Sequence, residues 1–203
     1  YGQADAFIAA NVMCHIPDLQ GIAKGIDRLL KPMGVFVFED PYLGNMIDKT
    51  SYDQIYDEHV FVFCALSVAN AFGRHGFELV DVEPQITHGG SMRYTLAKKG
   101  AKQPNKAVAL LIAKETELGL DRAETFDTFR RNCETSRDQL MAVLNDLRER
   151  GAKVAGYGAT SKSTTVINYC GITANHIAFI SDTTPTKQGK FSPGAHVPIR
   201  PYE

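Results

Sequence analysis

The fold is decided by the stretch AFIAANVMCHIPDLQGIAKGIDRLLKPMGVFVFEDP, residues 6–41. Its first apolar run, residues 6–10, ends at Asn11 and predicts a buried strand. Asp18 can cap the following helix, in which apolar residues recur at helical spacing until residues 31–34 stop it. The run VFVF then predicts a second buried strand. Strand, helix and strand in this order form a right-handed crossover unit of a parallel sheet.

The composition is that of an ordinary soluble globular protein. The chain has 203 residues, of which 44% are hydrophobic and 22% charged, and its formal net charge is -1. This balance gives no electrostatic reason to expect nucleic acid or an anionic membrane as a partner, so small molecules are favoured. No run approaches the roughly 18 to 20 apolar residues of a membrane span, and the start does not resemble a signal peptide. We therefore expect a cytoplasmic protein.

The cysteines lie far apart in the sequence. They lack the short paired spacings of a zinc site and the density of a disulfide framework. The four are Cys14, Cys64, Cys133 and Cys170. We expect reduced, structural thiols and no metal site in this chain.

The middle of the chain predicts more sheet, followed by helices. Residues 67–75 favour a helix, and residues 77–82 and 91–97 favour strands that could pair as an antiparallel edge. Residues 103–150 have apolar positions at helical intervals among many charges, which predicts two helices, the second of them long.

A second crossover unit is predicted in the last third of the chain. A strand begins at Lys153 and enters a glycine-containing turn, a helix follows over residues 161–170, and residues 177–180 form the next strand. The alternation of strands and helices indicates an α/β fold with two doubly wound sheets.

Polar residues follow the two strands of the first unit. His15 comes after the first strand, and Glu39 and Asp40 end the second. Active sites of parallel sheets lie outside these carboxyl ends. The sequence YDEH, residues 56–59, follows the second strand and must cross the same edge of the sheet. A histidine after a strand is also a common structural hydrogen bonder, and this interpretation of His15 stays open.

The YDEH sequence has the groups needed for proton abstraction beside a carbonyl. An imidazole with an ordinary pKa of about 6.5, such as that of His59, can act as a base near neutral pH when a carboxylate orients it. Glu58 could supply the carboxylate, and Tyr56 could donate to an oxyanion. The alternative is a polar turn before a buried helix.

Two glycine-containing turns are candidate anion sites. In GYGATSK, residues 156–162, the glycines allow a tight turn, and the amides at the start of the next helix favour a phosphate. A polar cap without a ligand explains the same residues. Asp182 could accept a ribose hydroxyl or cap residues 183–185. In HGGSMR, residues 88–93, the Arg93 side chain could bind a carboxylate or phosphate, or the segment could be a plain hairpin connection.

Taken together, these segments resemble the NDP-keto-sugar C-methyltransferases, which are class I S-adenosylmethionine-dependent methyltransferases. Nearly the whole chain carries the resemblance. The matching segments are residues 11–18 (NVMCHIPD), 52–68 (YDQIYDEHVFVFCALSV), 87–97 (THGGSMRYTLA), 154–172 (VAGYGATSKSTTVINYCGI) and 182–199 (DTTPTKQGKFSPGAHVPI).

The resemblance implies a domain order. We expect the carboxy-terminal half of a Rossmann-like methyltransferase domain in residues 1–100, a helical connection in residues 101–150, and part of a second Rossmann-like, nucleotide-sugar domain in residues 151–203. The sequence contains neither the cysteine cluster of the family's zinc-binding region nor the early glycine-rich loop of its cofactor site. We therefore expect zinc and the first half of the cofactor site in a missing amino-terminal region, and the isolated chain to be inactive.

The resemblance also implies a reaction. In the family, a proton is removed from the sugar carbon beside a ketone, and the enolate attacks the methyl group of S-adenosylmethionine. By motif, His59 resembles the general base, and Tyr56, Glu58 and His15 lie near the reacting sugar. The expected partners are a nucleotide-linked keto-sugar and S-adenosylmethionine.

The nucleotide sugar is expected at the second glycine turn. The resemblance implies a role there for Ser161, Lys162 and Asn168. Gly158, in the glycine turn, and Arg93, whose guanidinium could bind an anion, are also expected to bind the substrate. Two other functions stay open at this point. One is a non-catalytic nucleotide-sugar binding module, and the other is an NAD-dependent oxidoreductase built on an incomplete dinucleotide fingerprint.

Overall fold

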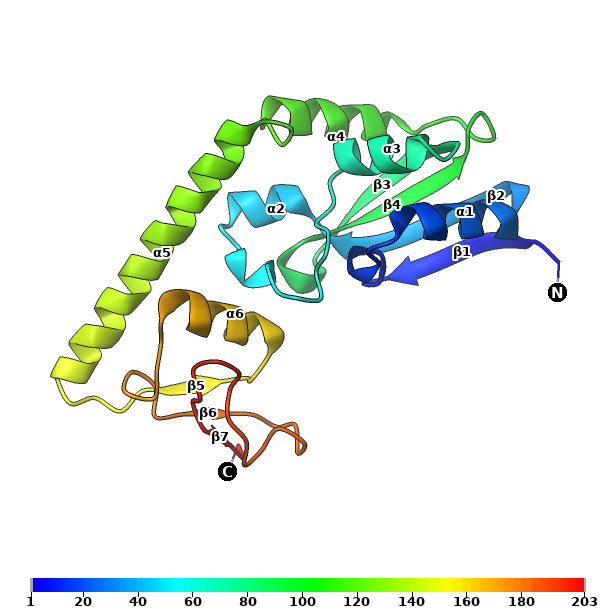
Figure 1. The fold of residues 1–203 in the computed structure, drawn as a ribbon. Helices are drawn as coiled ribbons and strands as arrows, with labels where there is room; N and C mark the ends of the chain where they lie inside the picture. Colours follow the sequence, from blue (N-terminus) through cyan, green and yellow to red (C-terminus); the bar gives the residue numbers. More distant parts are fainter. Residues whose placement is uncertain (1, 203) are drawn as a thin grey trace. The chain divides into compact units, whose positions relative to one another are not determined.

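The computed structural model describes residues 2–202, which form two compact units (Figure 1). Unit 1 comprises residues 2–51 and 57–127, and unit 2 comprises residues 52–56 and 128–202. Both units combine strands and helices, so the predicted α/β class is confirmed. No helix within residues 2–202 has the length and apolar character needed to cross a membrane.

Unit 1 is built on a four-stranded sheet of order β1-β2-β4-β3. The strands are β1 (Ala4–Ala10), β2 (Leu30–Pro41), β3 (Phe77–Gln85) and β4 (Ser91–Lys98). β1 and β2 are parallel, whereas β4 is antiparallel to both β2 and β3. The predicted antiparallel pair is confirmed, but the pair is not simply an edge. β4 lies inside the sheet because its other side also pairs with β2.

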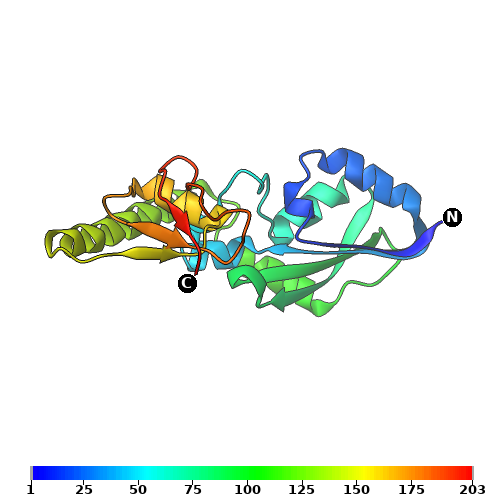
Figure 2. The same cartoon turned by 90° about the horizontal axis from the view of Figure 1, so that it is seen from below.

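The crossover helix α1 (Leu19–Leu29) lies along one face of this sheet (Figure 2). Asp18 caps it as predicted, because its Oδ1 accepts a hydrogen bond from Gly21 N at 2.8 Å. The following strand starts at Leu30, earlier than the VFVF run suggested. The pairing of β1 with β2 shifts register between Ala4 and Ala6, opposite this extension. A Cβ atom on Gly34 would lie 3.1 Å from the Ala4 carbonyl oxygen. Glycine therefore lets the two backbones approach there.

Aromatic side chains form the core of unit 1. Phe36 and Phe38 stack with ring centroids 5.1 Å apart, and Phe38 lies 4.9 Å from Tyr94. Phe72 closes the cluster with its centroid 5.3 Å from that of Phe36. All four are fully buried or nearly so. Phe72 comes from helix α3 (Ala65–Gly73), which this cluster fixes against the sheet.

Three further helices, α2 (Leu43–Asp48), α4 (Lys106–Glu117) and α5 (Ala123–Glu149), follow β2 and β4 along the chain. Unit 1 contains α2 and α4. The helix α5 contains the boundary between the units. α4 and α5 confirm the two predicted helices, the second of them long.

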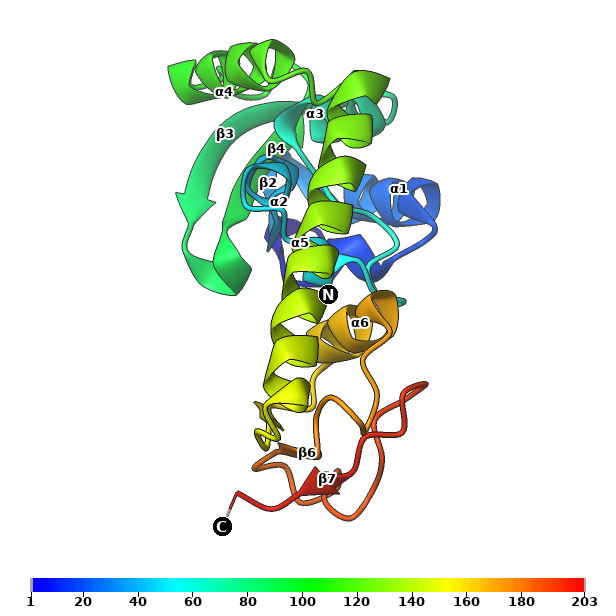
Figure 3. The same ribbon diagram turned by 90° about the vertical axis from the view of Figure 1, so that its left-hand side faces the viewer.

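Unit 2 contains a parallel sheet of order β5-β6-β7. The strands β5 (Ala155–Tyr157) and β6 (Phe179–Ser181) are joined by α6 (Ser161–Cys170), which lies over the strands of this unit (Figure 3). The predicted crossover is therefore confirmed. A third strand, β7 (Ile199–Arg200), was not predicted because it has only two residues. A second Rossmann-like domain remains a prediction.

Local signals define α6. The Thr160 Oγ1 accepts from Ser163 N at 3.1 Å, and Ser163 Oγ accepts from Thr160 N at 2.9 Å, which forms a capping box. Gly171 ends the helix at a φ of 67°, a left-handed conformation that glycine adopts without strain. The buried core of the unit comprises Leu144, Ile167, Cys170, Ile172, Ile177, Ile180 and Val197. All four cysteines of the chain are free and buried, as expected.

Candidate active site

Two histidines meet at the carboxyl end of the sheet in unit 1. His15 ends a short 3-10 helix, Met13–His15, that follows β1. Phe61 N donates to Cys14 O at 3.1 Å, and this bond holds the segment after YDEH beside the turn. As a result, the His15 and His59 ring centroids lie 5.2 Å apart at an interplanar angle of 68°.

The same segment is held on its other side by the end of β2. Leu43 N donates to Phe63 O at 2.8 Å, and Tyr42 and Phe63 form a parallel bridge. His59 therefore lies between the turn at residues 57–58 and a segment that is held at Phe61 and Phe63. This explains how a residue with no regular secondary structure has a defined position.

The other YDEH residues differ in their surroundings. Glu58 is exposed, in a turn where its carbonyl accepts from Val60 N at 3.2 Å. Tyr56 is half-buried and belongs to unit 2, whereas His59 belongs to unit 1. Catalytic roles for Tyr56 and Glu58 therefore remain predictions.

Asp40 is a buried carboxylate next to the 3-10 helix that carries His15. Its side chain is inaccessible to solvent, and its Oδ2 accepts from Cys14 N at 3.1 Å. Its Oδ1 is buried without a hydrogen-bond partner among residues 2–202. Burial raises the pKa of Asp40 to about 6, and the Cys14 hydrogen bonds and the charge of His15 oppose that rise. The sequence placed Asp40 at this sheet edge but did not indicate that it would be buried.

The cluster also contains three side chains of the kinds that can bind a metal ion. Ligand atoms of Cys14, His15 and His59 all lie within 4.8 Å of one another. Burial, together with the charge of Asp40, raises the pKa of the Cys14 thiol far above its ordinary value. The neutral thiol is therefore the favoured form of Cys14 without a metal ion.

Arg93 is engaged within the sheet. Its guanidinium donates to Glu39 Oε2 at 3.0 Å and to Glu83 Oε2 at 2.9 Å, across β2, β4 and β3. Thr87 Oγ1 donates to the other Glu39 oxygen at 3.1 Å. A carboxylate or phosphate would have to displace these partners, so substrate binding by Arg93 remains a prediction without a contact that favours it.

Unit 2 contains a pocket of about 450 Å³ at the start of α6. It brings together hydroxyl groups from the helix start and ammonium groups from the loop after β6. The lining residues are Ala159, Thr160, Ser161, Ser163, Thr164, Thr186, Lys187, Lys190, Phe191, Ser192, Pro193 and Ile199. Ser161, a predicted substrate-binding residue, therefore lines a pocket together with Lys187 and Lys190, which were not predicted to bind substrate. The signal for them in the sequence was TKQGK, residues 186–190.

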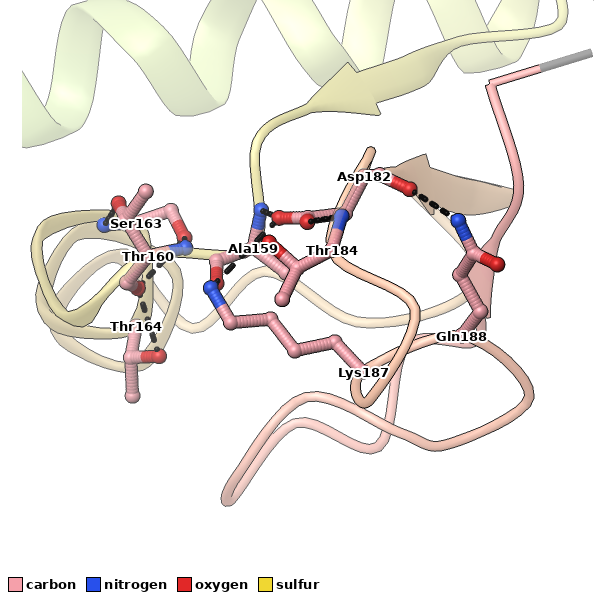
Figure 4. A network of polar contacts seen from close by, with 8 residues as sticks. All are labelled: Ala159, Thr160, Ser163, Thr164, Asp182, Thr184, Lys187 and Gln188. Carbon is pink, nitrogen blue, oxygen red and sulfur yellow. Dashed lines mark hydrogen bonds and ion pairs between the residues drawn. The ribbon is translucent and has the colours of Figure 1, made fainter.

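Asp182 accepts hydrogen bonds from backbone groups beside this pocket (Figure 4). Its Oδ2 accepts from Ala159 N at 2.6 Å, and its Oδ1 accepts from Thr184 N at 2.7 Å. Lys187 Nζ donates to Ala159 O at 2.7 Å and lies 3.8 Å from Asp182 Oδ2. The Thr184 and Ala159 hydrogen bonds lower the pKa of Asp182 to about 2. Of the two roles considered for Asp182, the structure shows the cap and not a free acceptor for a ribose hydroxyl.

The other predicted binding residues have structural partners or lie outside the pocket lining. Gly158 N donates to Ser181 O at 2.8 Å, with a φ of 86° that favours glycine. Asn168 Nδ2 donates to the carbonyl oxygens of Thr164 and Pro193 at 2.8 and 3.1 Å, so Asn168 holds the loop that passes α6. Lys162 is half-buried and is not among the described residues that line the pocket.

Comparison with known protein families identifies the class of this chain. Residues 86–203 match the family model described as C-methyltransferase C-terminal domain, and residues 2–82 match one described as methyltransferase domain. The first match covers more than half of the chain, which therefore belongs to the C-methyltransferase family. The resemblance to C-methyltransferases seen in the sequence is confirmed.

Individual relatives agree with this assignment. The chain is 34% identical over 200 residues to the C-methyltransferase NovU of Streptomyces niveus, an alignment covering 98% of this chain and 48% of NovU. The chain thus spans about half the length of this curated relative.

Two solved structures are similar at a low level. Magnesium protoporphyrin IX methyltransferase from Synechocystis PCC 6803 with bound SAH has a TM-score of 0.36 and 14% identity, and the match covers 49% of this chain and 47% of that chain. The M1.HpyAVI-SAM complex has a TM-score of 0.30 and 19% identity, with coverage of 50% and 46%.

Proposed function

We propose that this chain contributes the general base and part of the sugar-nucleotide site of an S-adenosylmethionine-dependent C-methyltransferase. The proposed substrate is a nucleotide-linked keto-deoxysugar that is methylated at the carbon beside its ketone. The observation that carries the proposal is the contact between the His15 and His59 rings at the carboxyl end of the sheet. Membership of the C-methyltransferase family supports the class of reaction.

The proposed chemistry begins with proton transfer to His59. The C–H bond beside the ketone breaks, its proton moves to a ring nitrogen of His59, and the electron pair forms an enolate. His15, whose ring lies against that of His59, orients the base. Tyr56 is the proposed donor to the enolate oxygen, a role in which a hydroxyl stabilises developing charge. S-adenosylmethionine, when bound, supplies the methyl group.

The carboxyl end of β1 has an atom suited to that cofactor. Asn11 follows β1 directly, and its Oδ1 is buried without a hydrogen-bond partner among residues 2–202. Leaving a buried carbonyl oxygen unpaired is costly, so a ligand that brings a donor would be stabilised there. Asn11 is therefore the residue we propose to accept from the amino group of the cofactor.

The pocket at the start of α6 is the proposed binding site for the nucleotide part of the substrate. The helix start and Lys190 provide donors suited to a diphosphate, and Lys187, whose Nζ already donates to Ala159 O, lines the same pocket. Phe191, which is 60% exposed and lines the same pocket, offers an apolar surface for a base or sugar ring. This arrangement favours a nucleotide sugar over an uncharged substrate.

Replacing His59 with Asn in the full-length protein tests the proposal. The readouts are methyl transfer to dTDP-4-keto-6-deoxyglucose and deuterium exchange from D2O at the carbon beside its ketone. We expect both rates to fall at least about a hundredfold, the scale of general-base catalysis, with dTDP affinity unchanged. His75→Asn is the matched control, because His75 lies in unit 1 at the end of α3 and should leave both rates unchanged.

The outcomes separate the competing functions. Normal methyl transfer by the His59→Asn protein would reject His59 as the base. Tight dTDP binding by the wild-type protein, with no methyl transfer or exchange on any keto-sugar, would instead support a non-catalytic binding module. Binding of NAD with displacement of dTDP would support the oxidoreductase.

A further inference from the structure

We propose that Asp40 is a positioning residue for the His15–His59 pair, and that its buried negative charge supports the pair when it takes up a proton. This inference rests on the proposed function, because it assigns the group that helps the proposed base. It adds a residue that touches neither substrate nor cofactor and acts through the histidines.

The first argument is geometric. Asp40 ends β2, and its Oδ2 accepts from Cys14 N at 3.1 Å, inside the 3-10 helix that carries His15. The neighbouring Cys14 O accepts from Phe61 N at 3.1 Å, within the segment that carries His59. Asp40, Cys14 and Phe61 therefore form a chain of hydrogen bonds that links the strand end to both histidine-bearing segments.

The second argument is the cost of burying Asp40. The carboxylate is inaccessible to solvent, and one of its oxygens has no hydrogen-bond partner among residues 2–202. A buried charge with incomplete pairing destabilises a fold unless a compensating charge is near. An asparagine could accept the same Cys14 bond without carrying a charge. The charge itself is therefore the feature that needs an explanation.

The third argument concerns the groups around Asp40. Cys14 and His15 face it from the 3-10 helix, Tyr94 from β4, and His59 packs against His15. Burial keeps the Cys14 thiol and the Tyr94 phenol protonated, because it raises the pKa of each far above its ordinary value. Of these neighbours, only the histidines can carry a positive charge near neutral pH.

The consequence for the reaction is electrostatic. Removal of the substrate proton places a positive charge on the imidazole pair, and a fixed negative charge nearby favours that state. Asp40 itself titrates in the relevant range, because burial raises its pKa to about 6. Its support should therefore be present at neutral pH and disappear as the pH falls.

The test compares wild-type, Asp40→Asn and Asp18→Asn full-length proteins by deuterium exchange into dTDP-4-keto-6-deoxyglucose. Asp18 is the control because it also accepts a backbone N–H bond, but at the exposed start of α1. For Asp40→Asn we expect kcat to fall by about 10- to 100-fold with KM nearly unchanged, a scale within general-base effects. The ratio of wild-type to Asp40→Asn rates should shrink towards one as the pH falls through about 6.

A purely structural role predicts a different result. In that case the rate ratio would be constant with pH, and this result would overturn the proposal, as would equal rates of the two proteins at neutral pH. A carbon-13 NMR titration of aspartate carboxyl groups in the wild-type protein gives a readout that does not depend on the variant's folding. Absence of an aspartate that titrates near pH 6 would also reject the inference.

Failure of this inference is distinguishable from failure of the proposed function. If His59→Asn abolishes exchange while Asp40→Asn leaves it unchanged, His59 remains the base and Asp40 has no part in it. If His59→Asn exchanges normally, the proposed function fails first.

Discussion

The rings of His15 and His59 contact each other edge to face, with centroids 5.2 Å apart, although the two residues come from different loops. The contact exists because Phe61 N donates to Cys14 O and thereby ties one loop to the other. The bond between Leu43 N and Phe63 O holds the same segment at a second point.

Replacing His15 with Phe should separate the packing role of the ring from its chemistry. Phenylalanine keeps an aromatic ring against His59 but removes both nitrogens. We expect the exchange rate of the full-length protein to fall by about 10- to 1000-fold, within the range of general acid–base effects, while the melting temperature changes little. A rate equal to that of wild type would show that His15 has only a packing role.

Lys190→Ala should weaken binding at the α6 pocket. The ammonium group lines the pocket, and removal of one cation from a diphosphate site costs roughly tenfold in affinity, or about 1.4 kcal/mol. Calorimetric titration with dTDP measures this change, and high salt should reduce the difference between the proteins. Lys153→Ala, at an exposed residue before β5, is the control. Equal dTDP affinities for all three proteins would place the nucleotide elsewhere.

Asp182→Asn should make unit 2 less stable in a pH-dependent way. The Thr184 and Ala159 hydrogen bonds lower the pKa of Asp182 to about 2 in the folded protein. The unfolded chain has an ordinary value of about 3.9, so the stabilisation is fully present above that pH and is lost as the pH falls towards 2. The melting temperatures of wild-type and variant proteins should therefore differ near neutral pH and converge in acid.

Asp138→Asn is the control for this measurement, because Asp138 forms an exposed ion pair with Arg137 on α5. A constant gap between wild type and Asp182→Asn from neutral pH down to about pH 2 would contradict the assigned linkage.

Glu115→Ala should destabilise unit 1 strongly. Glu115 is fully buried on α4, and its two oxygens accept from Ala65 N and Leu66 N at 2.9 and 2.8 Å, which satisfies the start of α3. Removing the carboxylate leaves the amides of buried Ala65 and half-buried Leu66 unpaired, so we expect a loss of about 2 to 4 kcal/mol in the free energy of unfolding. Urea unfolding measures the loss. Glu117→Ala, exposed two residues later, should change the midpoint little; a similarly small change for Glu115→Ala would contradict the capping role.

Gly90→Ala should be more harmful than Gly100→Ala. Both glycines have a positive φ, 133° and 78°, so alanine is strained at either position by about 1 to 2 kcal/mol. At Gly90 the added Cβ would also lie 1.8 Å from Asn45 Nδ2, whereas nothing lies within 4 Å at Gly100. Urea unfolding of the two variants should show a clearly lower midpoint for Gly90→Ala. Equal midpoints would mean that Asn45 moves aside at no cost.

The sequence alone determined most of the regular elements and the class of protein. Apolar runs and helical periodicity are local, so they predicted β1, α1, the core of β2 and the crossover of unit 2. The end signals of α6 are also local, because Thr160 and Gly171 act on backbone groups within a few residues. The motifs that carry the family resemblance could likewise be read from the chain itself.

The tertiary structure decided which side chains meet and which are already occupied. It brought His15 against His59 and buried Asp40 against Cys14. It also gave Arg93 two glutamate partners and used both oxygens of Asp182 in a cap. These outcomes depend on strand register and loop contacts between residues far apart in sequence. Sequence periodicity records which face of an element is apolar, but it contains no information on which distant donor reaches a given acceptor.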